Sequence, residues 1–175
     1  MSTIQTEQLF GAFAGDPVVI DSVIHGVQTS LTMCSAEAIC VGVSSLPIRD
    51  HGNITAIIGC HGDVSGFMTL NLSEDGARSL VSGFLGDEFH KISPEVVDGV
   101  GELANLVSGG IKKGLSGTSW AFSSVTVPSV IIGHNYQIAY TSGLNFISVA
   151  FELPNTVTLM VDQRLLQVSL SLLRL

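Results

Sequence analysis

Apolar side chains recur at every third or fourth position between Ser93 and Gly117, which predicts a long amphipathic helix. The recurring positions are Val96, Val100, Leu103, Val107 and Ile111. Ser93 is suited to cap this helix, because its hydroxyl can accept a hydrogen bond from an amide of the first turn, and Pro94 fits the first helical position. Gly114 and Gly117 can end it. The pattern predicts a helix over residues 94–115 with one apolar and one polar face.

Two shorter helices are predicted from the same kind of pattern. The first begins at the Asp16-Pro17 pair, where the aspartate can act as a cap, and runs to about Cys34. Its apolar positions are Val19, Ile20, Val23, Val27 and Leu31. The second helix is capped by Ser73 and runs to about Leu85.

The remaining apolar runs are short and rich in β-branched and aromatic residues, which is typical of strands. Strands are expected over residues 37–43, 54–60, 66–72, 120–127, 134–140, 146–153 and 156–161. The second and third are joined by His61-Gly62-Asp63, a connection that favours a tight hairpin. Because hairpins and helices are mixed along the chain, the predicted fold class is α+β, with a largely antiparallel sheet packed against long helices.

The length of 175 residues suits one ordinary domain. Residues 1–15 are expected to form a loose N-terminal arm or a short helix, and residues 16–175 a single domain. The Leu-rich tail after Asp162 is expected to be a packed terminal strand or helix. A loose internal similarity is also present, because a strand, a tight turn, a strand and a helix-like run occur in residues 54–85 and again in residues 146–175.

Composition narrows the classes of function. Hydrophobic residues make up 46% of the chain and charged residues 13%, with a mean hydropathy of +0.50, so we expect a large buried fraction or a sheet edge or face buried in an oligomer. The net charge of −8 argues against a nucleic-acid partner. No apolar run approaches the length of about eighteen residues that membrane insertion requires, and the N-terminus lacks the features of a signal peptide.

The three cysteines, Cys34, Cys40 and Cys60, are an odd number without C-x-x-C spacing. This usage favours buried free thiols in a reducing compartment, so the expected location is the cytoplasm.

The polar face of the helix over residues 94–115 carries the sharpest candidate for chemistry. Asp98, Glu102 and Asn105 are four and three residues apart, so their side chains are expected to converge on one exposed patch. A carboxamide both donates and accepts hydrogen bonds and can orient a water, while a carboxylate can anchor a cation on a partner. A solvated acidic helix face explains the same residues. The spacing alone therefore leaves both interpretations open.

The other polar residues predict no second site. The histidines are scattered and lack the spacing of zinc ligands: His25, His51, His61, His90 and His134. Glycines at positions 99, 101, 109 and 110 fall inside a helical pattern, where the favoured explanation is close packing against a neighbouring helix. Lys112 and Lys113 are expected to be ordinary lysines of the last helical turn.

Several segments together resemble the CheX/CheC family of chemotaxis phosphatases, and CheX more than CheC. GELANLVSGGIKKGLS resembles the signature helix of that family. IIGCHGDVSGFMTLNLSED resembles its glycine-turn hairpin leading into a capped helix, and SGFLGDEF resembles the end of that helix. The resemblance spans about residues 16–162, and the tail beyond it has no counterpart that can be placed.

The resemblance implies roles for the three residues of the polar helix face. Asn105 would orient the hydrolytic water on the aspartyl phosphate of a CheY-like response regulator, Glu102 would contact the regulator's active-site lysine, and Asp98 would be auxiliary. No cofactor is expected on this chain, since the Mg²⁺ belongs to the regulator. CheC-type members carry a second copy of the motif on the first helix, but the equivalent positions here are Asp21, His25 and Gln28, so one active site is predicted.

The resemblance also implies a homodimer with sheets joined across subunits, which suits the apolar composition. Two other functions stay open on the sequence. One is a docking module of the chemotaxis or flagellar-switch type that binds a regulator without catalysis. The other is a small-molecule or structural domain in which the polar helix face is simply exposed, and a buried Asn105 or a hidden Glu102 would favour it.

Overall fold

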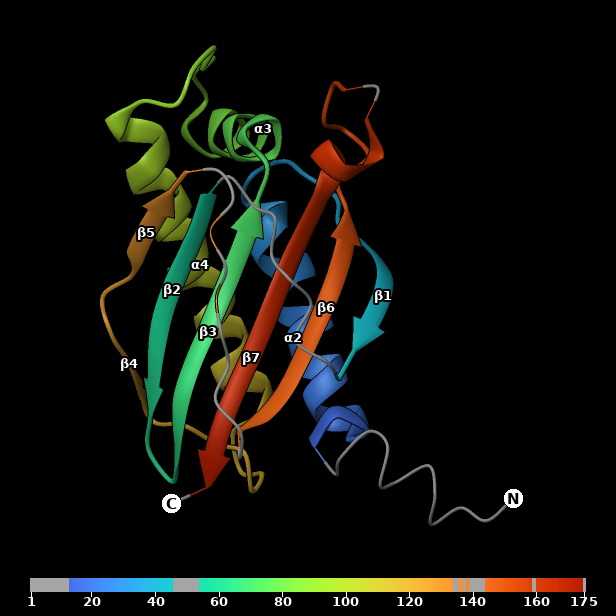
Figure 1. Ribbon diagram of the computed structural model, residues 1–175, viewed down its shortest axis with the longest axis vertical. Helices are drawn as coiled ribbons and strands as arrows, with labels where there is room; N and C mark the ends of the chain where they lie inside the picture. The colour runs from blue at the N-terminus through green and yellow to red at the C-terminus, as the bar shows by residue number, and fades with distance from the viewer. Residues whose placement is uncertain are drawn as a thin grey trace.

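The computed structural model describes most of the chain. The described residues are 13–45, 54–133, 136, 138, 144–158 and 160–174. They form one antiparallel sheet of seven strands and the helices α2, α3 and α4 (Figure 1). This arrangement confirms the predicted α+β class.

The strands lie in the sheet in the order β1-β6-β7-β3-β2-β4, and β5 also pairs with β2. Their bounds are β1 Ile39–Ser44, β2 Ile54–His61, β3 Val64–Leu72, β4 Ser124–Val125, β5 Ser129–Ile132, β6 Asn145–Glu152 and β7 Leu165–Arg174. β2 and β3 form the predicted hairpin, paired from Ile54 with Leu72 to Cys60 with Gly66. β7 lies between β6 and β3 in the middle of the sheet, so the last strand of the chain joins its two halves (Figure 1).

The helices begin and end close to where the sequence pattern predicts. Their bounds are α2 Pro17–Thr32, α3 Glu74–Leu85 and α4 Pro94–Gly114. The predicted caps are all present: Asp16 accepts a hydrogen bond from the amide of Val18 at 3.0 Å, Ser73 from Gly76 at 2.9 Å and Ser93 from Val96 at 3.5 Å. α3 ends at Gly86, whose φ of 74° lies in the left-handed region that glycine adopts readily.

α2 and α4 cover one face of the sheet, and α3 crosses its upper end (Figure 1). Alternate residues of the strands face these helices and form the core together with the apolar stripe of α4. The strands contribute, among others, Ile58, Met68, Val149 and Leu170, and α4 contributes Leu103 and Val107. α2 and α4 approach each other closely at two glycines, because a Cβ added to Gly110 would lie 2.9 Å from the Cα of Gly26. The predicted use of Gly110 in close helix packing is thus confirmed.

The opposite face of the central strands carries small polar side chains that are also buried. They are Thr55, Thr69, Asn71, Ser148, Ser169 and Ser171. Thr55 donates a hydrogen bond to Asn71 at 3.0 Å, and Ser169 donates one to Ser148 at 3.0 Å. These bonds offset part of the cost of removing the hydroxyls from water. The centre of the sheet is therefore buried on both faces.

Two predicted strands are wrong. Of residues 120–127 only Ser124–Val125 is a strand, because Thr118–Ala121 form a turn and the Trp120 ring packs against Phe13 and Arg174. The described part of residues 156–161 is a connection leading into the short 3-10 helix η1, Val161–Arg164. β5, which lies just beyond Pro128, was not predicted.

Other predictions concern the two ends of the chain and residues 134–140. The N-terminal arm over residues 1–15 and the strand over residues 134–140 lie mostly outside the described residues. The tail after Asp162 was expected to be a strand or a helix, and most of it forms the strand β7. The internal similarity does not extend to the fold: β6 and β7 pair like β2 and β3, but η1 lies in their connection and Leu165–Arg174, where the helix-like run was expected, is the strand β7.

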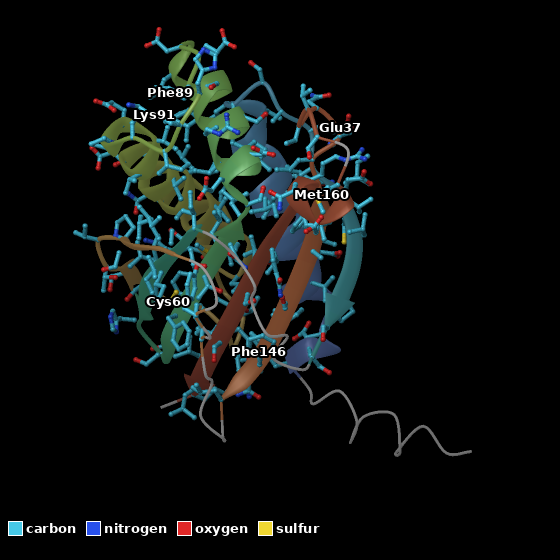
Figure 2. The ribbon with its side chains drawn as sticks, turned by 45° about the horizontal axis from the view of Figure 1, so that its top comes forward. Glu37, Cys60, Phe89, Lys91, Phe146 and Met160 are labelled. Carbon is cyan, nitrogen blue, oxygen red and sulfur yellow. The ribbon has the colours of Figure 1, made fainter. Side chains whose placement is uncertain are left out.

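All three cysteines are free thiols. Burial raises the pKa of Cys34 to about 11, and burial also raises the pKa of Cys60 to about 12, against a weaker opposing hydrogen bond to the Met68 backbone. Cys60 lies on β2, inside the body of the molecule (Figure 2). Because the thiolate is the reactive form, both side chains stay protonated and unreactive at neutral pH.

Candidate functional site

α4 presents the predicted polar stripe on the side that faces away from the core. Asp98 and Glu102 are exposed, and Asn105 is partly buried. They follow one another at helical steps of four and three residues, which places neighbouring Cβ atoms roughly 5–6 Å apart. The structure therefore brings the three predicted residues together on one surface. Glu102 is exposed and Asn105 is accessible, so a partner can reach all three side chains.

The three side chains have no bonding partner within the part of the chain that the structure describes. Among the described residues, none forms a hydrogen bond or ion pair with the carboxylates of Asp98 and Glu102 or with the carboxamide of Asn105. Only the backbone carbonyl of Asn105 accepts a bond, from the Ser108 hydroxyl at 2.9 Å. The carboxylates and the carboxamide are thus free to bind a partner or a water.

A groove of about 820 Å³ lies beside this stripe. On α4 it is lined by Val97, Asp98, Gly101, Glu102 and Asn105. The opposite wall is lined by Val125, Thr126, Val127, Pro128 and Val130, which belong to residues 123–132, here called the edge segment. The site is therefore two-sided, with a helix on one side and the outer edge of the sheet on the other.

The edge segment is held to both neighbouring elements. The Ser123 amide donates to the carbonyl of His61 at 2.9 Å, and the Thr126 amide donates to the carbonyl of Gly59 at 2.9 Å. The Thr126 hydroxyl accepts a further bond from the Gly59 amide at 2.9 Å. From the helix, the Lys112 ammonium donates to the carbonyl of Ser123 at 2.8 Å. Lys112 is thus more than a lysine of the last helical turn, because it ties α4 to the edge segment.

Glycines of α4 contribute to the shape of the site in different ways. A Cβ added to Gly101 would lie 3.4 Å from Cγ of Pro128, an ordinary van der Waals distance, so Pro128 packs beside the helix at this point. A Cβ on Gly99 would lie 2.6 Å from the side chain of Val81 on α3. Gly109 has open space, so helix packing does not explain it. The wall of the groove was not predicted from the sequence, where Pro128 was only the expected end of a strand.

The N-terminal turn of α4 carries a further acidic residue, Glu95, beside the two of the stripe. The hydroxyl of Ser93 and the residue's own amide hold the pKa of the Glu95 carboxyl below its usual value. An ionised carboxylate at this end also interacts favourably with the helix dipole. Figure 2 shows Phe89 and Lys91 at the same end of the molecule, in the connection that leads into α4.

α2 offers no counterpart of the stripe. Asp21, His25 and Gln28 are exposed on it, but Gln28 donates a hydrogen bond to the carbonyl of Ala38 at 3.1 Å. Within the described ranges, no three His, Cys, Asp or Glu residues come together as a metal site would require. No helix of the described chain has the length and apolar character needed to cross a membrane.

The antiparallel sheet with α2 and α4 on one face and the stripe on α4 defines a CheC/CheX-like α+β domain. Among solved structures, a putative chemotaxis protein from Desulfovibrio vulgaris Hildenborough matches with a TM-score of 0.75 and 23% identity, covering 92% of this chain and 99% of that one. Chemotaxis protein CheX from Vibrio vulnificus matches with a TM-score of 0.73 and 22% identity, over 88% and 98% of the two chains.

A third solved structure contains a partner. It is the CheX-CheY-BeF3-Mg²⁺ complex from Borrelia burgdorferi, which matches with a TM-score of 0.70 and 21% identity over 89% of this chain and 97% of that one. The family model described as chemotaxis phosphatase CheX matches residues 54–152, more than half of the chain. The chain belongs to the CheX family. No curated protein sequence matches it significantly.

Proposed function

We propose that this chain hydrolyses the aspartyl phosphate of a CheY-like response regulator in the cytoplasm. The observation that carries the proposal is the unoccupied pair on α4, an exposed Glu102 and an accessible Asn105 beside an open groove, in a member of the CheX family. The CheX-CheY complex from Borrelia supports the class of partner. The free thiols support a reducing compartment.

In the proposed mechanism the regulator supplies the phosphoryl group and its Mg²⁺, and this chain positions the attacking water. The Asn105 carboxamide accepts a hydrogen bond from a water and directs its oxygen toward phosphorus, in line with the bond to the regulator's aspartate. The new P–O bond forms as the bond to the aspartate breaks, and the aspartate leaves as a carboxylate together with inorganic phosphate. The proton lost by the water goes to the phosphate or to solvent.

Glu102 has a different part in the mechanism. Its carboxylate would pair with the lysine of the regulator's active site, and burial in the interface would strengthen that pair because water no longer screens it. Asp98 is one turn away and would act as an auxiliary charge at the rim. No residue of this chain is required as a nucleophile or as a metal ligand.

Glu102→Ala is expected to lower kcat/KM for dephosphorylation about 30-fold, because the regulator's lysine loses its partner in the interface. Asp98→Ala should have an effect of no more than about threefold, as for a charge at an exposed rim. The measurement is phosphate release from receiver domains phosphorylated with a small phosphodonor and Mg²⁺. Glu88→Ala, an exposed carboxylate in the α3–α4 connection, is the matched control. An unchanged kcat/KM in Glu102→Ala would remove this residue from the site.

We also propose that two copies of the chain join through β1. Among the described strands β1 pairs with β6 alone, and Ile39, Val41 and Val43 on it are 44%, 52% and 45% exposed. An apolar strand at the border of a sheet is suited to pair with a second copy of itself.

Val41→Lys is expected to shift the chain from dimer to monomer in sedimentation equilibrium, because a lysine on the edge opposes pairing. Val161→Lys introduces the same charge on η1, where the valine is 61% exposed, and should leave the oligomeric state unchanged. A dimer that survives Val41→Lys would place the interface elsewhere.

A further inference from the structure

Val127 and Pro128 interrupt the pairing of the edge segment with β2 at a point beside the stripe. Before them in the chain, Thr126 is hydrogen-bonded to Gly59 of β2, and after them Ser129 is paired with Ile57 of β2. Only Ile58 lies between these two partners, so Val127 and Pro128 are both opposite Ile58. Two residues opposite one is the arrangement of a β-bulge, which bends a strand and redirects its side chains. Val127 is 85% exposed as a result, on the wall of the groove that contains Glu102 and Asn105.

The bulge is fixed in place. Pro128 restricts its own φ and lacks an amide that would need a partner, which suits an edge position. Its ring comes close to α4 at Gly101, where even a Cβ would be 3.4 Å away. The start of the edge segment is tied to the same helix through Lys112 and Ser123. Val127 therefore projects from a rigid base at a set distance from the stripe.

The chemistry of the groove indicates the kind of surface that fits it. Its described lining includes the carboxylates of Asp98 and Glu102 and no cation, and the edge segment adds aliphatic side chains, of which Val127 is the most exposed. The complementary surface presents a cation with an apolar side chain next to it. Burying one projecting aliphatic side chain in such a contact gives affinity, while the charged pair gives orientation.

We infer that Val127 is an anchor for the receiver domain of the response regulator and sets its affinity, while the stripe on α4 acts on the phosphoryl group. This inference rests on the proposed function for the identity of the partner. It adds to the contact made by α4 a second contact with the regulator, which is made by the edge segment and is separate from Glu102 and Asn105. The receiver surface that meets Val127 is apolar and borders the lysine that meets Glu102.

The test compares Val127→Ser with Val157→Ser. Val157 is 98% exposed in the β6–β7 connection, so the two substitutions remove the same side chain from two exposed positions. Binding is measured by fluorescence anisotropy with a labelled receiver domain activated by Mg²⁺ and beryllofluoride, and turnover with the phosphorylated domain. Val127→Ser should raise Kd and KM about tenfold with kcat unchanged. Val127→Ile keeps an aliphatic side chain and should keep Kd and KM near their wild-type values. Val157→Ser should match wild type.

The outcomes separate the inference from the proposed function. If Val127→Ser binds and turns over like wild type, the inference is wrong and the phosphatase proposal is untouched. If wild type binds with the expected sensitivity at position 127 but never hydrolyses, the anchor stands and the phosphatase proposal falls. If Val127→Ser lowers kcat with Kd unchanged, the side chain is not an anchor. If wild type binds no receiver domain, both proposals fail.

Discussion

Asn105→Ala should lower kcat for dephosphorylation about 100-fold and leave the affinity for the regulator within a factor of about two. The carboxamide is proposed to hold the attacking water, an interaction that acts in the transition state and contributes little to docking. Its side chain makes no hydrogen bond with the described residues, so its loss should not disturb the fold. The measurement is single-turnover decay of the phosphorylated receiver domain at saturating concentrations of each variant.

Asn105→Asp tests the same point without changing the size of the side chain. It keeps an oxygen that can accept from the water but places a negative charge beside the phosphoryl oxygens, and because this charge repels them we expect at least the same loss of kcat. If either variant kept the kcat of wild type, water would be positioned by another group and the role of Asn105 would be wrong. A parallel loss of binding would instead make Asn105 a docking residue.

Gly110→Ala should destabilise the protein by about 2 kcal/mol, although alanine is the better helix former. A Cβ at this position would lie 2.9 Å from the Cα of Gly26, and backbone cannot move aside as a side-chain tip can. α2 and α4 would have to separate along the whole contact. The free energy of unfolding can be followed by urea denaturation with fluorescence of Trp120, the one tryptophan of the chain, which is buried.

The neighbouring Gly109 provides the control. A Cβ there meets nothing within 4 Å, so Gly109→Ala should stabilise the protein by about 0.5–1 kcal/mol through helix propensity alone. The two substitutions lie one position apart in the same helix, and we expect them to change the free energy of unfolding in opposite directions. Equal stabilities would show that the close contact with Gly26 does not require a glycine at position 110.

The helices could be predicted from the sequence because their signals are local. Asp16, Ser73 and Ser93 each precede an apolar stripe of helical period, and the structure uses all three as caps. The stripe of Asp98, Glu102 and Asn105 followed from the same periodicity, since residues three and four apart share a face.

The edge segment could not be predicted because its structure depends on distant partners. Ser123 and Thr126 are held by the backbone of β2, more than sixty positions earlier in the chain. The apolar run before Pro128 predicts one continuous strand, but the Trp120 ring is drawn into contact with Phe13 and Arg174, and only two residues pair as β4. The second wall of the site was missed for this reason.

The central position of β7 is also a matter of long-range pairing. Its residues alternate between the core and the buried polar face, so the Leu-rich tail predicts burial without indicating where the strand lies. β7 pairs with β3 on one side and with β6 on the other, and the sequence does not show which strands become its neighbours. Glu102 and Asn105 lie together on α4 as predicted, because helical periodicity is a local signal, and their roles stay a prediction.

The most direct test of the central claim is decay of phosphorylated regulator with a small amount of the wild-type chain, one copy for many regulators. An enzyme must turn over repeatedly, so we predict that the whole pool of regulator loses its phosphate well before it would on its own, with phosphate released in proportion to time. If the chain binds the phosphorylated regulator and the phosphate is lost only at the regulator's own rate, the chain is a docking module and the phosphatase proposal is wrong.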